Sequence, residues 1–248
     1  MMMLDGDVVL LAGATGRVGG VTLATFVREG ARVVVVSRSV ERAQASVDGV
    51  LAGDERKAAI PFTADLVEPA QAQAAVDACV ERYGRIDACI SLAGASTVTR
   101  LVDSSLDDLR ANVRGHLETT YNLTMPALRA MLAQPYRTGT RSRGRIAVVT
   151  AGSSRQPAPG RGLFGAAKAG VNVLLQAIAR EHKADGIVAN ALVLGGVATD
   201  AARGRMDPAD FAAAATPQEV ADALAFLASD RGSGINGALV DLNAREVD

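Results

Sequence analysis

Three glycines near the amino terminus have a spacing that suits a bound phosphate group. Gly13, Gly16 and Gly19 follow a short apolar run and open a segment of helical spacing. Glycine lets the backbone turn sharply and approach a pyrophosphate, which then lies at the positive end of the helix. The alternative is a tight turn without a ligand. Because the triplet stands between a first strand and a first helix, we favour a nucleotide site. Its predicted residues are Gly13, Thr15, Gly16, Arg17, Val18 and Gly19.

The end of the second apolar run indicates which dinucleotide would bind. Sites for NAD typically carry an Asp or Glu there, which holds the ribose 2′-hydroxyl. This sequence has Ser37 and Arg38 instead. A guanidinium group pairs with phosphate through charge-assisted hydrogen bonds, so Arg38 suits a 2′-phosphate and Arg17 offers a second positive charge. NADP(H) is therefore favoured over NAD(H). The alternative is that both arginines are solvated loop residues.

The elements that must position these groups follow from seven short β-branched runs that alternate with helical segments. Runs such as VVLL, VVVV and IAVV are continuously apolar, which is typical of strands buried on both faces of a parallel sheet. We expect one α/β domain over 1–248, a Rossmann fold with a doubly wound parallel sheet of about seven strands and helices on both faces. The expected strands are 8–11, 32–36, 58–62, 86–91, 145–150, 188–193 and 238–242. The expected helices are 17–29, 40–51, 69–83, 105–133, 162–183 and 217–229.

Two further stretches are irregular in sequence. Residues 195–215 form an Ala-rich connection that is long enough to act as a lid over a substrate. Residues 137–145 (RTGTRSRGR) are polar and basic. Because they precede the fifth strand, we place them at the sheet edge opposite the cofactor and interpret them as a solvated loop rather than a ligand site.

Composition excludes several classes of function. The 248 residues hold 26 Lys and Arg against 27 Asp and Glu, a net charge of −1, which excludes nucleic-acid binding through bulk positive charge. With two Cys, two His and no HExxH motif, we expect no metal site. The longest apolar runs fall short of the roughly 20 residues of a membrane helix, and the amino terminus lacks the basic region of a signal peptide. We therefore expect a cytoplasmic protein that works without a membrane.

Motifs along essentially the whole chain resemble the short-chain dehydrogenase/reductase family. They are Asp65-Leu66, Ser91-Leu92-Ala93-Gly94, Asn112, the segment Asn190 to Thr199, and the last helix from Thr216 to Asp230. The resemblance implies that Asp65 and Leu66 flank the adenine ring. It implies that Ala93, Gly94 and Lys168 face the ribose, and that Gly195, Val197 and Thr199 line the nicotinamide. It also implies a homo-oligomer, a dimer or tetramer, formed through the two long helices.

The catalytic pattern of that family is incomplete here. The family uses a Tyr, a Lys four residues later, a Ser about thirteen residues before the Tyr, and a helix Asn. Lys168 and Asn112 match, but Phe164 stands at the Tyr position and Ala151 at the Ser position, and no Tyr follows Tyr136. A local shift would bring Ser153 or Ser154 into the site. The alternative is that both serines cap a turn in the loop 152–162.

Three outcomes are compatible with this departure. In the first, another group donates the proton, namely Ser153, Ser154, a water or the substrate. In the second, the chain binds NADP(H) without turnover, as a sensor or as a partner of an active relative. In the third, the fold serves assembly alone. We favour the first, and the presence of the Gly turn, Arg38 and Lys168 argues against the third. We expect hydride transfer between NADP(H) and an apolar carbonyl or alcohol substrate. His116 lies four residues after Asn112, and we interpret it as a packed helix residue more readily than as a substitute acid.

Overall fold

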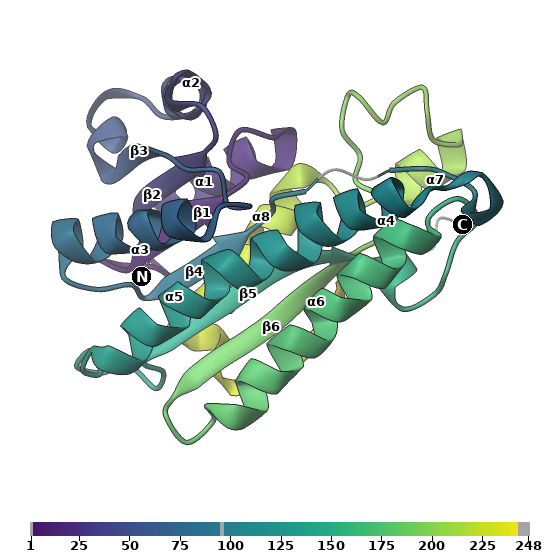
Figure 1. The fold of residues 1–248 in the computed structure, drawn as a ribbon. Helices are drawn as coiled ribbons and strands as arrows, with labels where there is room; N and C mark the ends of the chain where they lie inside the picture. Colours follow the sequence, from purple (N-terminus) through teal and green to yellow (C-terminus); the bar gives the residue numbers. More distant parts are fainter. Residues whose placement is uncertain (1, 95–96, 243–248) are drawn as a thin grey trace.

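The fold is built on a sheet of seven parallel strands in the order β3-β2-β1-β4-β5-β6-β7 (Figure 1). The structure is a computed structural model, and it describes residues 2–94 and 97–242. Each of the seven predicted strands is present. Their bounds are β1 Val8–Ala12, β2 Arg32–Ser37, β3 Ala59–Thr63, β4 Ala88–Ser91, β5 Gly144–Ala151, β6 Ile187–Leu194 and β7 Leu239–Leu242.

Helices cover both faces of this sheet, so the predicted doubly wound α/β fold is confirmed. Successive residues of a strand point to opposite faces. In β1, Val8 and Leu10 pack with α3, α5 and α6, whereas Val9 and Leu11 pack with α1, α2 and α8. The helix bounds are α1 Arg17–Arg28, α2 Val40–Val50, α3 Pro69–Tyr83, α4 Leu106–Asn112, α5 Thr119–Ala133, α6 Gly162–Glu181, α7 Pro208–Ala213 and α8 Pro217–Ala228.

The segment predicted as one helix over 105–133 contains a turn of wider winding. Residues Val113–Glu118 form a π-helical turn between α4 and α5. The Thr119 hydroxyl donates a hydrogen bond to the Arg114 carbonyl at 2.9 Å, five residues back. Turns of this kind inside α-helices are frequent at functional sites. Here the turn buries the side chains of Asn112 and His116 against the rest of the fold.

The basic stretch 137–145 is only in part the solvated loop that its composition predicts: Thr138, Gly139 and Arg141 are exposed, but Arg145 is buried in β5. Arg145 is 1% exposed, and its Nη2 lies 3.2 Å from Asp7 Oδ2 at the amino ends of the strands. Arg137 Nη1 lies 2.6 Å from the other oxygen of Asp7. Burial of this carboxyl outweighs the two arginines and raises the pKa of Asp7. For Arg145 the prediction failed because its partner lies 138 residues away in the sequence.

The length and composition of α6 would also allow it to cross a membrane, although we expected no such segment. Half of the apolar stretch of this helix is buried inside the fold, where α6 packs along β5 and β6. A helix from the core of a globular domain can have the same length and apolar composition, and α6 is a core helix of this fold.

Candidate functional site

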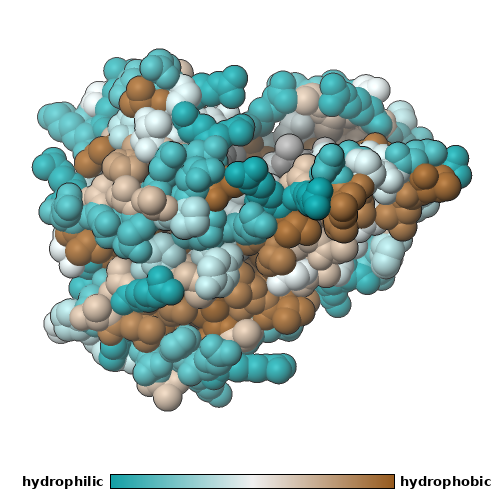
Figure 2. All heavy atoms as spheres, viewed as in Figure 1, coloured by the Kyte–Doolittle hydropathy of each residue, from teal (hydrophilic) through white to brown (hydrophobic). Residues whose placement is uncertain are grey.

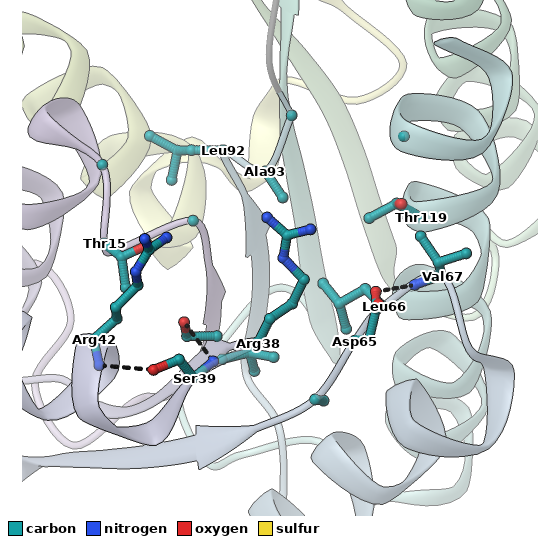
Figure 3. Close-up of a pocket in the computed structure, with 17 residues that line it drawn as sticks. Thr15, Arg38, Ser39, Arg42, Asp65, Leu66, Val67, Leu92, Ala93 and Thr119 are labelled. Carbon is teal, nitrogen blue, oxygen red and sulfur yellow. Dashed lines mark hydrogen bonds between the residues drawn. The ribbon is translucent and has the colours of Figure 1, made fainter. Parts of the chain in front are cut away.

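A cavity of about 580 Å³ opens at the carboxyl ends of β1, β2 and β4 (Figure 3). The chain runs from β1 outward to β3 on one side and then crosses to β4 on the other. In open α/β sheets such a reversal of strand order leaves a crevice in which ligands bind. The cavity is lined by Gly13, Thr15, Gly16, Val36, Ser37, Arg38, Ser39, Arg42, Ala64, Asp65, Leu66, Val67, Leu92, Ala93, Gly94, Gly115 and Thr119.

The glycine turn divides between the cavity and the packing beneath it. Gly13 has a φ of 91°, and a Cβ there would lie 2.7 Å from the Leu92 carbonyl carbon. A Cβ at Gly19 would lie 2.0 Å from the Gly13 oxygen, so Gly19 lets α1 pack directly on the turn. Gly16 precedes α1 and provides no side-chain cap, which leaves the first N–H groups of that helix for a ligand. Of the predicted residues, Arg17, Val18 and Gly19 do not line the cavity.

Two arginine side chains extend into this cavity: Arg38, which was among the predicted residues, and Arg42, which was not. Figure 3 shows Arg42 alongside Thr15 and Arg38 reaching toward Ala93. Within residues 2–94 and 97–242, neither guanidinium forms an ion pair with a carboxylate. Sequence reasoning missed Arg42, which lies one helical turn past Arg38. Its backbone N–H donates to the Ser39 hydroxyl at 3.2 Å, and this N-cap fixes the first turn of α2 beside the cavity.

Asp65 and Leu66 form the wall after β3, where they were predicted to flank an adenine ring. The Asp65 Oδ1 accepts a hydrogen bond from the Val67 N–H at 3.1 Å, and the Asp65 N–H donates to the Gln71 side chain at 2.8 Å. These bonds hold the turn in one conformation. Ser37 is likewise ordered, since its hydroxyl accepts from the Ser39 N–H at 3.3 Å.

Two buried polar side chains that do not themselves line the cavity, His116 and Lys168, lie close to Gly94, which does. Gly94 lines the cavity with a φ of 134°, and a Cβ there would lie 3.7 Å from Lys168 Nζ and 2.5 Å from His116 Nδ1. Lys168 is 5% exposed and donates to the Val149 carbonyl at 2.9 Å. Burial lowers the pKa of Lys168 to about 8. Phe164, one turn earlier on α6, meets the His116 ring edge to face with centroids 5.0 Å apart.

The two serines after β5 have different surroundings. Ser154 Oγ donates to the Ala151 carbonyl at 2.6 Å and accepts from Asn172 at 2.8 Å, so this hydroxyl is used within the fold. Ser153 Oγ is buried and has no hydrogen-bond partner among the described residues. Its backbone packs on Gly165, the neighbour of Phe164. Ser153 is therefore the serine whose hydroxyl the described part of the fold leaves unpaired.

The remaining predicted residues do not line the cavity. Asn112 is buried, and its amide is engaged with Thr97 Oγ1 at 3.0 Å and the Asp108 carbonyl at 2.8 Å. Gly195, Val197 and Thr199 follow β6 and belong to the segment 195–215, which we expected to be a lid. In that segment a Cβ at Gly196 would lie 2.5 Å from Met206 Cε, so the chain folds back on the end of β6.

Known proteins with this sequence pattern and fold are oxidoreductases. The short chain dehydrogenase family matches residues 7–209. The chain is 30% identical to an A-factor type gamma-butyrolactone 1'-reductase (1S-forming) of Streptomyces virginiae, covering 95% of this chain and 93% of the relative. It is 28% identical to the 3-oxoacyl-[acyl-carrier-protein] reductase FabG of Thermotoga maritima, covering 98% of both.

Solved structures agree with this assignment. A short-chain dehydrogenase of Mycobacterium smegmatis superposes with a TM-score of 0.83 at 25% identity, covering 100% of this chain and 95% of that one. A short-chain type dehydrogenase/reductase of Mycobacterium ulcerans shares the fold with a TM-score of 0.86 at 21% identity, covering 97% and 89%. The chain belongs to the short-chain dehydrogenase/reductase family. It is an oxidoreductase of that family, and this membership implies a nicotinamide cofactor.

Replacing Lys168 by methionine is expected to stabilise the protein at pH 7 while removing a charge beside the cavity. Burial lowers the pKa of Lys168 from 10.5 to about 8, so below pH 8 the folded state carries a desolvation cost of about 3 kcal/mol. Between these pKa values the unfolded chain binds more protons, and the free energy of unfolding therefore rises with pH. The lost hydrogen bond to Val149 leaves an expected net gain of about 2 kcal/mol at pH 7.

Urea unfolding at pH 7 and pH 10 measures this effect. In Lys168→Met the rise with pH should be much smaller than in the unchanged protein. Lys57→Met is the control, because the Lys57 side chain is 80% exposed. If Lys168→Met is less stable at pH 7 and its free energy of unfolding still rises fully between pH 7 and pH 10, the lowered pKa of Lys168 is contradicted.

Proposed function

We propose that this chain is an NADP(H)-dependent oxidoreductase that interconverts a carbonyl and an alcohol. The observation that carries the proposal is the pair Arg38 and Arg42, two guanidinium groups in one cavity with no carboxylate partner among the described residues. A phosphate with two negative charges suits such a pair, because charge-assisted and bidentate hydrogen bonds are the strong ones. The ribose 2′-phosphate is the group that distinguishes NADP(H) from NAD(H).

The other lining residues fit the rest of a dinucleotide. The bare backbone at Gly13, Gly16 and the start of α1 suits a pyrophosphate, because a helix N-terminus presents N–H groups and positive potential. Asp65 and Leu66 stand where an adenine would lie, and Ala93 and Gly94 where a ribose would lie. The cavity volume falls within the usual range for small-molecule sites, about 300–1,000 Å³.

We further propose that the substrate is an apolar carbonyl compound bound beside Phe164, Ser153 and the segment 195–215. The bound dinucleotide supplies or accepts the hydride, and the chain must orient the substrate and move one proton. Neither Phe164 nor Ala151 has an ionisable group, so this part of the site is apolar. The names of two relatives describe reductases, one of a gamma-butyrolactone and one of a 3-oxoacyl group, and this supports carbonyl reduction.

Titration with NADPH and NADH tests the cofactor, and carbonyl reduction tests the chemistry. We expect NADPH to bind about 10²- to 10⁴-fold more tightly than NADH, since two charge-assisted contacts are worth about 3–6 kcal/mol. Equal affinities would contradict the 2′-phosphate assignment, and absence of binding would contradict the function itself. The second candidate function is NADP(H) binding without turnover, which Phe164 favours. NADPH binding with no turnover on a broad panel of ketones would support it.

We also propose that the protein is a homo-oligomer. Large apolar side chains are exposed on and before α4, namely Leu101, Val102, Leu106 and Leu109, and Val173 is exposed on α6. Figure 2 shows brown surface over these neighbouring helices. A second copy covering this face would remove the apolar surface from water. Light scattering behind a size-exclusion column tests the proposal, and a mass of 25.5 kDa would refute it.

A further inference from the structure

The π-helical turn carries a histidine that the proposed function leaves without a role. His116 is 3% exposed, in keeping with its interpretation from the sequence as a packed helix residue. Its ring lies against Gly94, a residue that lines the cavity, and close to two side chains of α6. It packs on the Gly94 backbone, it meets the Phe164 ring with centroids 5.0 Å apart, and Lys168 approaches the same side of Gly94.

We propose that His116 is the catalytic acid and base of this site, in place of the missing phenol. This inference rests on the proposed oxidoreductase function. An imidazole is the side chain that most often serves as a general acid and base, and His116 places one against Phe164, which stands at the position of the missing phenol. A general acid of this kind typically contributes about 10²- to 10⁴-fold to a rate.

The proton transfer balances with the hydride transfer. In reduction, the carbonyl carbon gains a hydride from the reduced dinucleotide, and the carbonyl oxygen gains a proton from the His116 imidazolium. The carbon–oxygen π bond opens, one C–H and one O–H bond form, and His116 becomes neutral. The carbonyl is reduced and the dinucleotide is oxidised. His116 then takes a proton from solvent before the next cycle.

Few charged groups face His116 from α4, α5 and α6, the helices that contact the π-helical turn. On α5 the charged residue is Arg129, which is exposed. From α6, Lys168 approaches the same glycine. The charged side chains of α4 lie at the surface. There Asp107 pairs with Arg110, and the Asp108 carboxylate accepts a hydrogen bond from the Ser105 N–H. Within the turn, Arg114 pairs with Glu68, and Glu118 is exposed. Lys168 is therefore the charged group nearest to the His116 imidazole among these groups.

Three variants test the role of His116 in turnover. His116→Gln keeps a polar side chain without a usable proton, and we expect kcat to fall about 10²-fold or more while the NADPH dissociation constant changes less than about threefold. Adding Phe164→Tyr to His116→Gln should recover a large part of the loss, because the new phenol lies against residue 116. His182→Gln is the control. Unchanged kcat in His116→Gln with NADPH still bound would overturn the inference.

Magnetic resonance gives a second reading that needs no turnover. The chain has two histidines, so His182→Gln assigns both imidazoles. We expect the His116 titration midpoint to be lower with NADP⁺ than with NADPH, because the oxidised ring carries a positive charge near the imidazole. The His182 signal, whose ring bonds to Asp185 at 2.9 Å, should not differ. A His116 signal that ignores both bound nucleotides overturns the inference alone. Failure of both nucleotides to bind overturns the proposed function with it.

Discussion

The double variant Arg38→Ala/Arg42→Ala is expected to lose about 10²- to 10⁴-fold in affinity for NADPH while its affinity for NADH stays nearly constant. Both guanidinium groups extend into the cavity, and neither forms an ion pair within the described residues. Each hydrogen bond to a charged group is worth about 1.5–3 kcal/mol, and every 1.4 kcal/mol is a factor of ten in the dissociation constant. Fluorescence titration of the unchanged and variant proteins measures both affinities.

A third arginine separates the sequence-based expectation from the structural one. The sequence predicts that Arg17 assists with the 2′-phosphate, but Arg17 is exposed and does not line the cavity. Arg17→Ala should therefore retain NADPH affinity within about threefold, and Arg42→Ala should lose about 10-fold or more. If Arg17→Ala weakens NADPH more than Arg42→Ala does, the structural assignment of the phosphate pocket is wrong.

The second large effect concerns stability and involves the buried ion pair of Asp7 and Arg145, at the amino ends of the strands. Asp7→Ala would leave the fully buried Arg145 without its carboxylate. Removing one partner of a buried ion pair typically costs about 3–5 kcal/mol. For a chain of this size that cost corresponds to a fall in Tm of about 6–20 °C. Thermal unfolding followed by circular dichroism measures it.

Two further variants show whether the cost comes from the unpaired charge. Asp7→Leu/Arg145→Met removes both members, and it should recover most of the stability, because apolar groups often replace a buried pair without loss. Asp107→Ala breaks an exposed pair with Arg110 and should change Tm by less than about 2 °C. A double variant no more stable than Asp7→Ala would show that the packing of Asp7 matters rather than its charge.

The sheet could be predicted from the sequence because its signals are local. Continuous apolar runs such as Val33 to Val36 are typical of strands whose two faces are both covered. Each apolar residue in such a run is further evidence for a buried strand. The glycine turn after β1 was equally visible. The sequence did not show that Gly13 and Gly19 have packing roles, because these roles depend on backbone atoms of other segments.

The parts of the site that escaped prediction depend on helix phase and on distant partners. Arg42 reaches the cavity because a helical side chain points back toward the amino end of its helix, over Ser39. The π-helical turn shifts the phase of 113–118 and buries His116, and no composition signal marks such a turn. Ser153 and Ser154 are identical as residues, and the hydrogen bonds of Ser154 with the Ala151 carbonyl and with Asn172 on α6 distinguish them.

The order of strands has a consequence for how the chain folds during synthesis. β1 leaves the ribosome first, but it lies in the interior of the finished sheet with β2 on one side and β4 on the other. Until residues 88–91 have been translated, one edge of β1 presents unpaired N–H and C=O groups to other chains. Before β4 pairs with β1, the growing chain therefore exposes a strand edge that can pair with other chains, and slow translation near that point would prolong this exposure.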